Sequence, residues 1–335
     1  MNLSNGRGEN ETVINISDDF FSSPSEREKK LIVKEASMLA FCMAFVLFLS
    51  YLLQTLFLGA GRLINEDLLD SEIFREVTVL ISYAVSLTVP FSLFGAYTKI
   101  PAEKALKNRH TGFLTMLSCL FASLGVAVVG MFSSAFLTFF LSKLGIVFSA
   151  SFTFSPANRW AFGIYMLNMT IVPALFEEIA FRGFLMQSLR RFGDGFALFA
   201  SAFCFALIHI TPTRFPHTFI MGLVIGYFVL FTGSLKTGVI IHFVYNLAIA
   251  SLSLAADAGS LDSAFLNISF GVLMLIFAIP SLFYLLRNYH GMFMLRRGRA
   301  VNPAGENIRA FLKSRGMILF YFIVFVLAFK ELVIL

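Results

Sequence analysis

The chain alternates long apolar runs with short polar segments. Runs without Asp, Glu, Lys or Arg cover 36–58, 77–98, 113–142, 160–176, 195–213, 215–235, 237–256, 263–286 and 317–329. A helix needs about 20 apolar residues to cross the hydrocarbon core of a bilayer. In lipid, only internal hydrogen bonds satisfy the backbone N–H and C=O groups. The pattern therefore predicts an all-α, polytopic membrane helix bundle with eight core transmembrane helices and a ninth at the C-terminus.

The composition supports a membrane protein. Of the 335 residues, 58% are hydrophobic and 14% are charged, whereas a soluble domain carries about 25% charged residues. Three cysteines lie far apart in apolar runs, at Cys42, Cys119 and Cys204. Their odd number and wide spacing argue against a disulfide framework and a cysteine-based metal site, and we interpret them as packing residues.

The charges between the apolar runs predict the orientation of the bundle. Basic residues gather in the N-terminal flank, in 99–109, in a turn at 183–192 and in 287–316, whereas 59–75 and 257–262 are rich in acidic residues. Alternation across nine helices puts every basic segment on one side, which the positive-inside rule assigns to the cytosol. The net charge of +6 therefore reflects topology, and we expect no nucleic-acid partner.

These patterns divide the chain into four parts. We expect a polar cytosolic tail at 1–35, the membrane bundle at 36–286, a basic cytosolic loop at 287–316 and a C-terminal transmembrane helix at 317–335. The tail begins without an apolar segment, so we expect no cleavable signal peptide there. The loop could instead be an amphipathic stretch at the interface. We expect a multi-pass protein of the cell membrane with a cytosolic N-terminus.

Six polar side chains interrupt the second half of the bundle, where ionisable groups are costly and usually serve a purpose. They are Glu177, Glu178, Arg182, His209, His242 and Asn246. Taken singly, a membrane Glu–Arg pair or a histidine is commonly a structural link between helices. Six such groups in so short a stretch favour a functional site.

Helical spacing assigns different tasks to the two adjacent glutamates. Glu178 and Arg182 are four residues apart, so they share a face and can form an ion pair. Glu177 points about 100° away by the 3.6-residue period. A buried carboxylate without that cation suits a general base or acid. Pro173, four residues earlier, predicts a kink near the site because it removes a helical hydrogen bond.

The remaining three polar residues suit the chemistry of a carbonyl group. His242 and Asn246 share a helix face and offer a ring N–H and an amide NH2, two donors that could hold an oxyanion. His209 shares a face with Phe205 and could orient a water with Glu177 or relay its proton. No Ser–His or Cys–His pair is evident, so attack by water is favoured over covalent catalysis.

The patterns Glu-Glu-x-x-x-Arg, Phe-x-x-x-His and His-x-x-x-Asn on successive helices resemble the CPBP family of intramembrane glutamic proteases. That family includes CAAX prenyl endopeptidases and Abi-type proteins of bacteriocin processing or self-immunity. The resemblance covers about 173–250, including Thr232-Gly233-Ser234-Leu235, and implies a protease-like core at about 160–255.

The resemblance implies an eight-helix endopeptidase that hydrolyses a peptide bond without a covalent intermediate. Glu177 and His209 would activate water, and His242 and Asn246 would stabilise the oxyanion. Glu178 and Arg182 would support the site. No cofactor is expected, and the expected partners are membrane lipid and a peptide or membrane-protein substrate, prenylated or not.

Two other functions remain open at this stage. A zinc-dependent membrane protease would use Glu177, His209 and His242 as ligands, because zinc accepts histidine and carboxylate groups. The usual His-Glu-x-x-His spacing of such enzymes is absent. A non-catalytic immunity or scaffold protein would use the same groups only to hold helices together. A transporter is disfavoured, because the sequence lacks broken helices in two matching halves.

The depths that we expect for these residues in the membrane conflict with a shared site. Counted along straight helices, Glu177 and His242 fall toward the inner side, whereas His209 falls about 20 Å from the start of its helix at 1.5 Å per residue. His217 follows Pro216 at the start of a run, and we expect it at the membrane interface.

Overall fold

The computed structural model describes residues 23–148, 158–257 and 262–334. Its helices are α1 (Pro24–Ile64), η1 (Glu66–Leu69), α2 (Glu72–Tyr97), α3 (Ala102–Ala105), α4 (Phe113–Lys143), α5 (Arg159–Met169), α6 (Ile171–Glu177), η2 (Glu178–Leu185), α7 (Met186–Leu189), η3 (Arg190–Phe192), α8 (Asp194–Leu207), α9 (Phe215–Thr232), α10 (Leu235–Asp257), α11 (Ser263–Asn288), α12 (Ala304–Leu312) and α13 (Arg315–Lys330). Two short strands, β1 (Ile146–Phe148) and β2 (Leu332–Ile334), pair antiparallel.

The predicted all-α membrane bundle is confirmed. Within the described residues, 7 helices are long and apolar enough to cross a membrane, and α12 with α13, bent by 59°, would make an eighth. The helix α8 is apolar but has only 14 residues, so the expected count of eight or nine full spans is not established. Large apolar side chains face outward, among them Phe136, Phe283 and Phe325, as the surface of a membrane protein requires.

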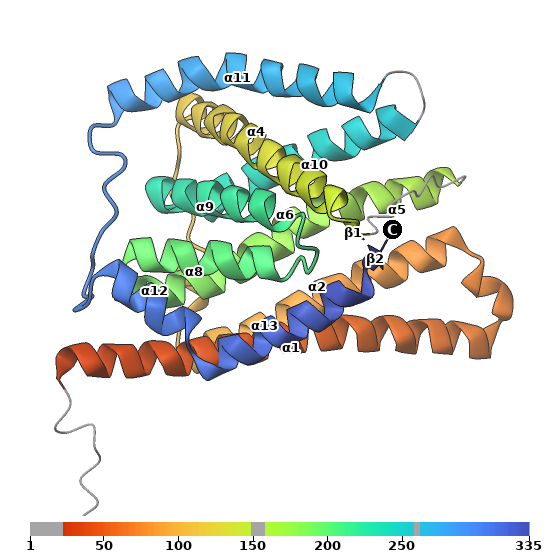
Figure 1. The fold of residues 1–335 in the computed structure, drawn as a ribbon, viewed down its shortest axis with the longest axis horizontal. Helices are drawn as coiled ribbons and strands as arrows, with labels where there is room; N and C mark the ends of the chain where they lie inside the picture. Colours follow the sequence, from red (N-terminus) through yellow and green to blue (C-terminus); the bar gives the residue numbers. More distant parts are fainter. Residues whose placement is uncertain (1–22, 149–157, 258–261, 335) are drawn as a thin grey trace, which may run out of the picture.

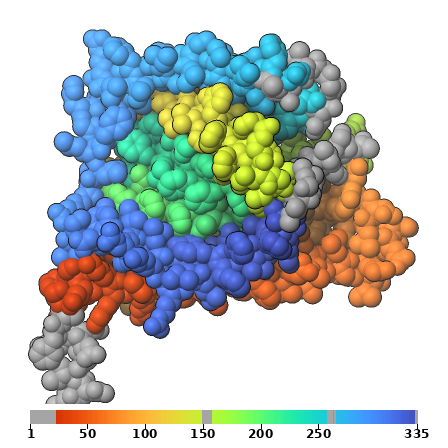
Figure 2. Space-filling model, viewed as in Figure 1, coloured from red at the N-terminus to blue at the C-terminus, as the bar shows by residue number. Residues whose placement is uncertain are grey.

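Long helices pack side by side around the second half of the chain. Figure 1 shows α1 and α2 running together with α13 along them, and α4 lying beneath α11. In Figure 2, α12 and α13 cover the boundary between α1 and α8. A close approach of α9 to α8 is possible because residue 222 is glycine: a Cβ there would lie 3.0 Å from the Cα of Ala202.

The helix that carries the two glutamates continues much farther than the charge pattern predicted. The apolar run 160–176 ends at Glu177 in the sequence, but helical structure continues through η2, α7 and η3 to Phe192. The expected turn at 183–192 is therefore wrong, and the chain reverses only around Gly193. A charge normally marks the end of a membrane segment, whereas Glu178 and Arg182 are fully buried within the bundle.

This longer helix removes the conflict in depth between the two halves of the site. Glu177 precedes Gly193 by as many residues as His209 follows it. Two helical segments that meet at a turn therefore bring the two side chains to the same depth, and the expected 20 Å offset was wrong. The predicted interruption near Pro173 is present, because α5 ends at Met169 and Thr170 departs from helical geometry with φ −123° and ψ −73°.

The basic segments meet at one end of the bundle. The carboxylate of Glu28 accepts hydrogen bonds from the backbone N–H groups of Val301 (2.7 Å) and Asn302 (3.1 Å) and from the side chain of Asn307 (2.8 Å). The N–H of Asp194 donates to the carbonyl of Arg296 at 2.9 Å. The expected 287–316 loop therefore packs on the start of α1 and on the turn before α8, and it contains α12.

The expected N-terminal tail lies only partly within the described residues. The helix α1 begins at Pro24, and Ser23 caps it through a hydrogen bond from the N–H of Glu26. Basic residues of the N-terminal flank lie in its first turns. Residues 1–22 lie outside the described residues.

Candidate active site

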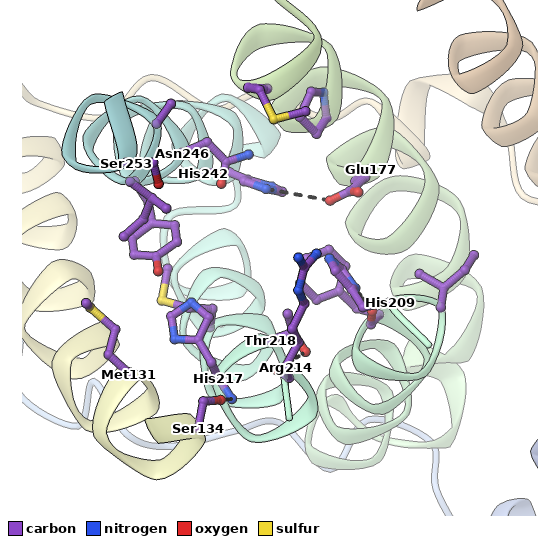
Figure 3. A pocket seen from close by; sticks show the side chains of 18 of the residues that line it. Met131, Ser134, Glu177, His209, Arg214, His217, Thr218, His242, Asn246 and Ser253 are labelled. Carbon is purple, nitrogen blue, oxygen red and sulfur yellow. Dashed lines mark hydrogen bonds and ion pairs between the residues drawn. The ribbon is translucent and has the colours of Figure 1, made fainter. Parts of the chain in front are cut away.

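Four of the predicted site residues line one cavity of about 1000 Å³ inside the bundle. They are Glu177, His209, His242 and Asn246 (Figure 3). The cavity wall is formed mainly by apolar side chains of α2, α4, α9, α10 and α11. Ligand pockets of this kind are mostly apolar with a few converging polar groups, so the cavity fits a binding or catalytic site.

Glu177 ends α6 and is buried, with 6% of its surface exposed. Its Oε1 accepts a hydrogen bond from the hydroxyl of Tyr83 on α2. Its Oε2 lies 3.6 Å from Nε2 of His242 on α10. The carboxylate therefore accepts from a phenol and also faces an imidazole. Figure 3 shows the second of these contacts, between Glu177 and His242.

Glu178 and Arg182 form the ion pair that their spacing predicted. Nη1 of Arg182 donates to Oε1 of Glu178 at 2.8 Å, and both side chains are fully buried. Arg182 also donates to the carbonyl of Gly222 at 3.2 Å and lies over the ring of Phe205, with 4.4 Å between the guanidinium and the ring centre. A buried arginine in this position links η2 to α8 and α9.

The segment Glu178–Leu185 is a π-helix, which the sequence pattern did not indicate. Its wider turns follow directly after Glu177. Such segments are rare and frequently occur at functional sites. A π-helix depends on the packing around it, so a pattern with a period of 3.6 residues does not reveal it.

His242 is oriented by the second glutamate. Its Nδ1 lies 2.9 Å from Oε1 of Glu178, the same oxygen that accepts from Arg182. An ionised carboxylate can only accept hydrogen bonds, so Nδ1 carries a proton and Nε2 is turned toward Glu177. The expectation that His242 offers a ring N–H to an oxyanion therefore requires a proton on Nε2 as well.

His209 lies just beyond the end of α8, and its ring packs edge-on against Phe205 with 4.9 Å between the centres. Its Nδ1 lies 2.7 Å from the carbonyl oxygen of Phe205. A carbonyl oxygen only accepts, so Nδ1 carries the proton and Nε2 is left as an acceptor. The next residue, Ile210, has φ of 63°. A β-branched residue in this region is strained, which is a feature of functional sites.

Three residues of the cavity wall were not recognised as part of the site from the sequence. Tyr83 and Arg214 had no signal, since one lies in an apolar run and the other between two runs. His217 was expected at the membrane interface, but its ring lies against that of Tyr245, 5.1 Å between centres, in the wall of the cavity.

The three ligands of the zinc alternative come from different segments of the bundle. Within the part of the chain that the structure describes, no three His, Cys, Asp or Glu side chains are grouped so that they could hold a metal ion. Glu177, His209 and His242 line the same cavity but do not form such a group.

Comparison with known families agrees with the sequence resemblance. Residues 158–248 match the model of the type II CAAX prenyl endopeptidase Rce1-like family. The matched segment contains all six polar residues of the predicted site, and it confirms the resemblance to CPBP and CAAX proteases over this part of the chain. No curated protein and no solved structure matches the chain. The match supports a CAAX-type intramembrane protease in general terms.

Proposed function

We propose that this integral membrane protein is an endopeptidase in which Glu177 and His209 activate a water to hydrolyse a peptide bond. The observation that supports the proposal most strongly is the position of Glu177. Its carboxylate is buried in a cavity within the membrane bundle, between Tyr83 and His242. His209 and Asn246 line the same cavity.

In the proposed mechanism, Glu177 takes a proton from a water while the acceptor Nε2 of His209 orients it. The water oxygen bonds to the peptide carbonyl carbon, and the carbonyl π electrons move to the carbonyl oxygen. The resulting tetrahedral intermediate then collapses, the C–N bond breaks, and the proton held by Glu177 moves to the leaving amine. The products are a carboxylic acid and an amine.

Two donors stabilise the oxyanion in this mechanism. The side-chain amide of Asn246 lies one helical turn from His242 and can donate an N–H. His242 donates from Nε2 when both of its ring nitrogens carry a proton. Donors held in place before the reaction stabilise developing charge strongly, because no reorganisation is needed in the transition state.

The family match and the location of the site support a proposal for the substrate class. We propose that the substrate is a peptide or a membrane-protein tail, including a prenylated CAAX sequence, and that it enters from the lipid phase. We further propose that no metal or other cofactor is required, that the N-terminus is cytosolic, and that the protein resides in the cell membrane.

The test compares purified wild-type protein with Glu177→Gln on a prenylated CAAX peptide and a panel of membrane-protein tails. Removal of a general base lowers the rate by about 10²- to 10⁴-fold, and we expect a loss of that size with no effect of a chelator. The matched control is Glu306→Gln, because Glu306 is an exposed glutamate outside the cavity. Full activity in Glu177→Gln would refute the mechanism, and inhibition by the chelator would favour the zinc enzyme.

A further inference from the structure

A single arginine lies in the wall of the cavity that contains Glu177. Arg214 directly precedes α9, and among the described residues that line the cavity it is the one Lys or Arg. Figure 3 shows its side chain extending from the start of α9 into the cavity, beside His209 and toward the space below Glu177 and His242. A permanent positive charge is costly in a membrane cavity, so it marks a functional position.

The backbone around Arg214 is firmly held. Its N–H donates to the carbonyl of Thr211 at 3.0 Å, and its own carbonyl accepts from the hydroxyl of Thr218 at 2.9 Å. The hydroxyl of Thr211 in turn donates to Glu331 at 2.7 Å, which ties this loop to the end of α13. The same short loop carries His209, so the guanidinium and the histidine are presented to the cavity from one fixed segment.

The chemistry of this position fits a carboxylate. A guanidinium is planar and always charged, and its N–H groups match the two oxygens of a carboxylate. The positive end of the α9 dipole lies at the same point and adds to the attraction for an anion. A charge pair is much stronger in an apolar cavity than in water. A peptide can bring a carboxylate into a proteolytic site on an Asp or Glu side chain or at its C-terminus. The C-terminal carboxylate is the one that every unmodified peptide carries, whatever its sequence.

Building on the proposed function, we propose that Arg214 binds the C-terminal carboxylate of the substrate on the leaving-group side of the scissile bond. Arg214 lies beside His209, and an extended residue spans about 3.5 Å. The distance from the reacting carbonyl to the bound carboxylate is therefore short, and only a few residues are released. Arg214 is thus a specificity-determining residue for cleavage near a free C-terminus.

The test uses two farnesylated peptides with three residues after the modified cysteine, one ending in a carboxylate and the other in an amide. Wild-type protein is expected to prefer the carboxylate peptide by about 10- to 100-fold in kcat/KM, the range of a charged hydrogen bond. Arg214→Gln is expected to reduce this ratio to about one, and Arg214→Lys to restore part of it. Lys236→Gln, at an exposed lysine outside the cavity, keeps the wild-type ratio.

Two results would overturn the assignment: a wild-type ratio of one, or a ratio in Arg214→Gln that stays as high as in wild type. Binding separates this inference from the catalytic proposal. Peptide affinity is measured in Glu177→Gln and in the double variant Glu177→Gln/Arg214→Gln, where no turnover is needed. If the carboxylate preference in binding disappears with Arg214 although no variant cleaves, the subsite stands and the proposed reaction fails. The unfolding temperature of each variant shows that the protein is folded.

Discussion

The carboxylate of Glu178 and the imidazole of His242 are joined through Nδ1 at 2.9 Å, although they come from helices far apart in the sequence. The oxygen that accepts from His242 also accepts from Arg182. The buried ion pair and the proposed catalytic histidine therefore form one connected network. The ion pair has a second task besides holding helices together, because it sets which nitrogen of His242 is turned toward Glu177.

Removing the charge of Glu178 is expected to affect both stability and catalysis. In Glu178→Gln, Arg182 remains as a buried charge without its counter-ion, which costs about 3–5 kcal/mol. Partners that orient the histidine ligands of metal sites contribute about 10- to 100-fold in activity, and we expect a fall in kcat of similar size here. Thermal unfolding and kcat on the cleaved peptide measure the two effects.

The double variant Glu178→Gln/Arg182→Met separates the two effects. It leaves no buried unpaired charge, so part of the stability is expected to return. Its kcat is expected to stay low, because His242 still lacks the carboxylate. Wild-type kcat in a stable Glu178→Gln protein would show that the link to His242 has no part in the reaction.

Tyr83→Phe is expected to weaken catalysis. The substitution keeps the ring and removes the hydroxyl that donates to Glu177. A hydrogen bond of this kind contributes about 1.5–3 kcal/mol when one partner is charged, so we expect about a 10- to 100-fold fall in kcat. Tyr227→Phe is the control, because its hydroxyl donates to the carbonyl of Met292 at 2.6 Å, away from the cavity. Equal effects of the two variants would argue against a catalytic task for Tyr83.

The sequence predicted the local relationships within each helix. The ion pair of Glu178 with Arg182, and the separate direction of Glu177, follow from helical spacing and are present in the structure. The common face of His242 and Asn246 also holds, because both line the cavity. These relationships depend on neighbours within one or two turns, which a helical period describes well.

The sequence did not predict the relationships between helices. A charge normally marks the boundary of a membrane segment, so the sequence predicted that the fourth apolar run ends at Glu177. The rule failed here because Arg182 is fully buried inside the bundle. Tyr83 could not be recognised, since a tyrosine in an apolar run has no special spacing and its partner lies on another helix. The π-helix depends likewise on packing around Glu178.

Gly238→Ala, on α10, is expected to disturb the network of Glu178, Arg182 and His242. A Cβ at this position of α10 would lie 2.8 Å from Oε2 of Glu178 and 2.7 Å from Cγ2 of Val229. Forcing extra atoms into a packed interior costs about 1–3 kcal/mol, and the shift of the Glu178 carboxylate should lower kcat as well. Thermal unfolding and peptide cleavage measure both.

The matched control for this glycine is Gly163→Ala on α5, because a Cβ at residue 163 would meet no atom within 4 Å. Alanine favours a helix over glycine by about 1 kcal/mol, so this variant should be at least as stable as wild type. A Gly238→Ala protein that matched Gly163→Ala in both measurements would show that the carboxylate has room to move.

Glu28 lies at the junction between α1 and the 287–316 segment. Glu28 is 7% exposed, and its carboxylate accepts from two backbone N–H groups and from Asn307. In Glu28→Ala these donors lose their partner, and each unsatisfied buried group costs about 1–3 kcal/mol. We expect a lower unfolding temperature and faster proteolysis between α11 and α12, whereas peptide cleavage by the remaining folded protein is retained, because the cavity is not lined by this segment.

Glu306→Ala tests whether buried hydrogen bonds or surface charges hold the 287–316 segment on α1. Glu306 pairs with Lys29 at 2.7 Å in an exposed position, and exposed ion pairs contribute little to stability. Its replacement should leave both the unfolding temperature and the proteolysis rate near the wild-type values. If Glu306→Ala were as damaging as Glu28→Ala, the charge of the junction rather than its buried hydrogen bonds would hold the C-terminal helices on α1.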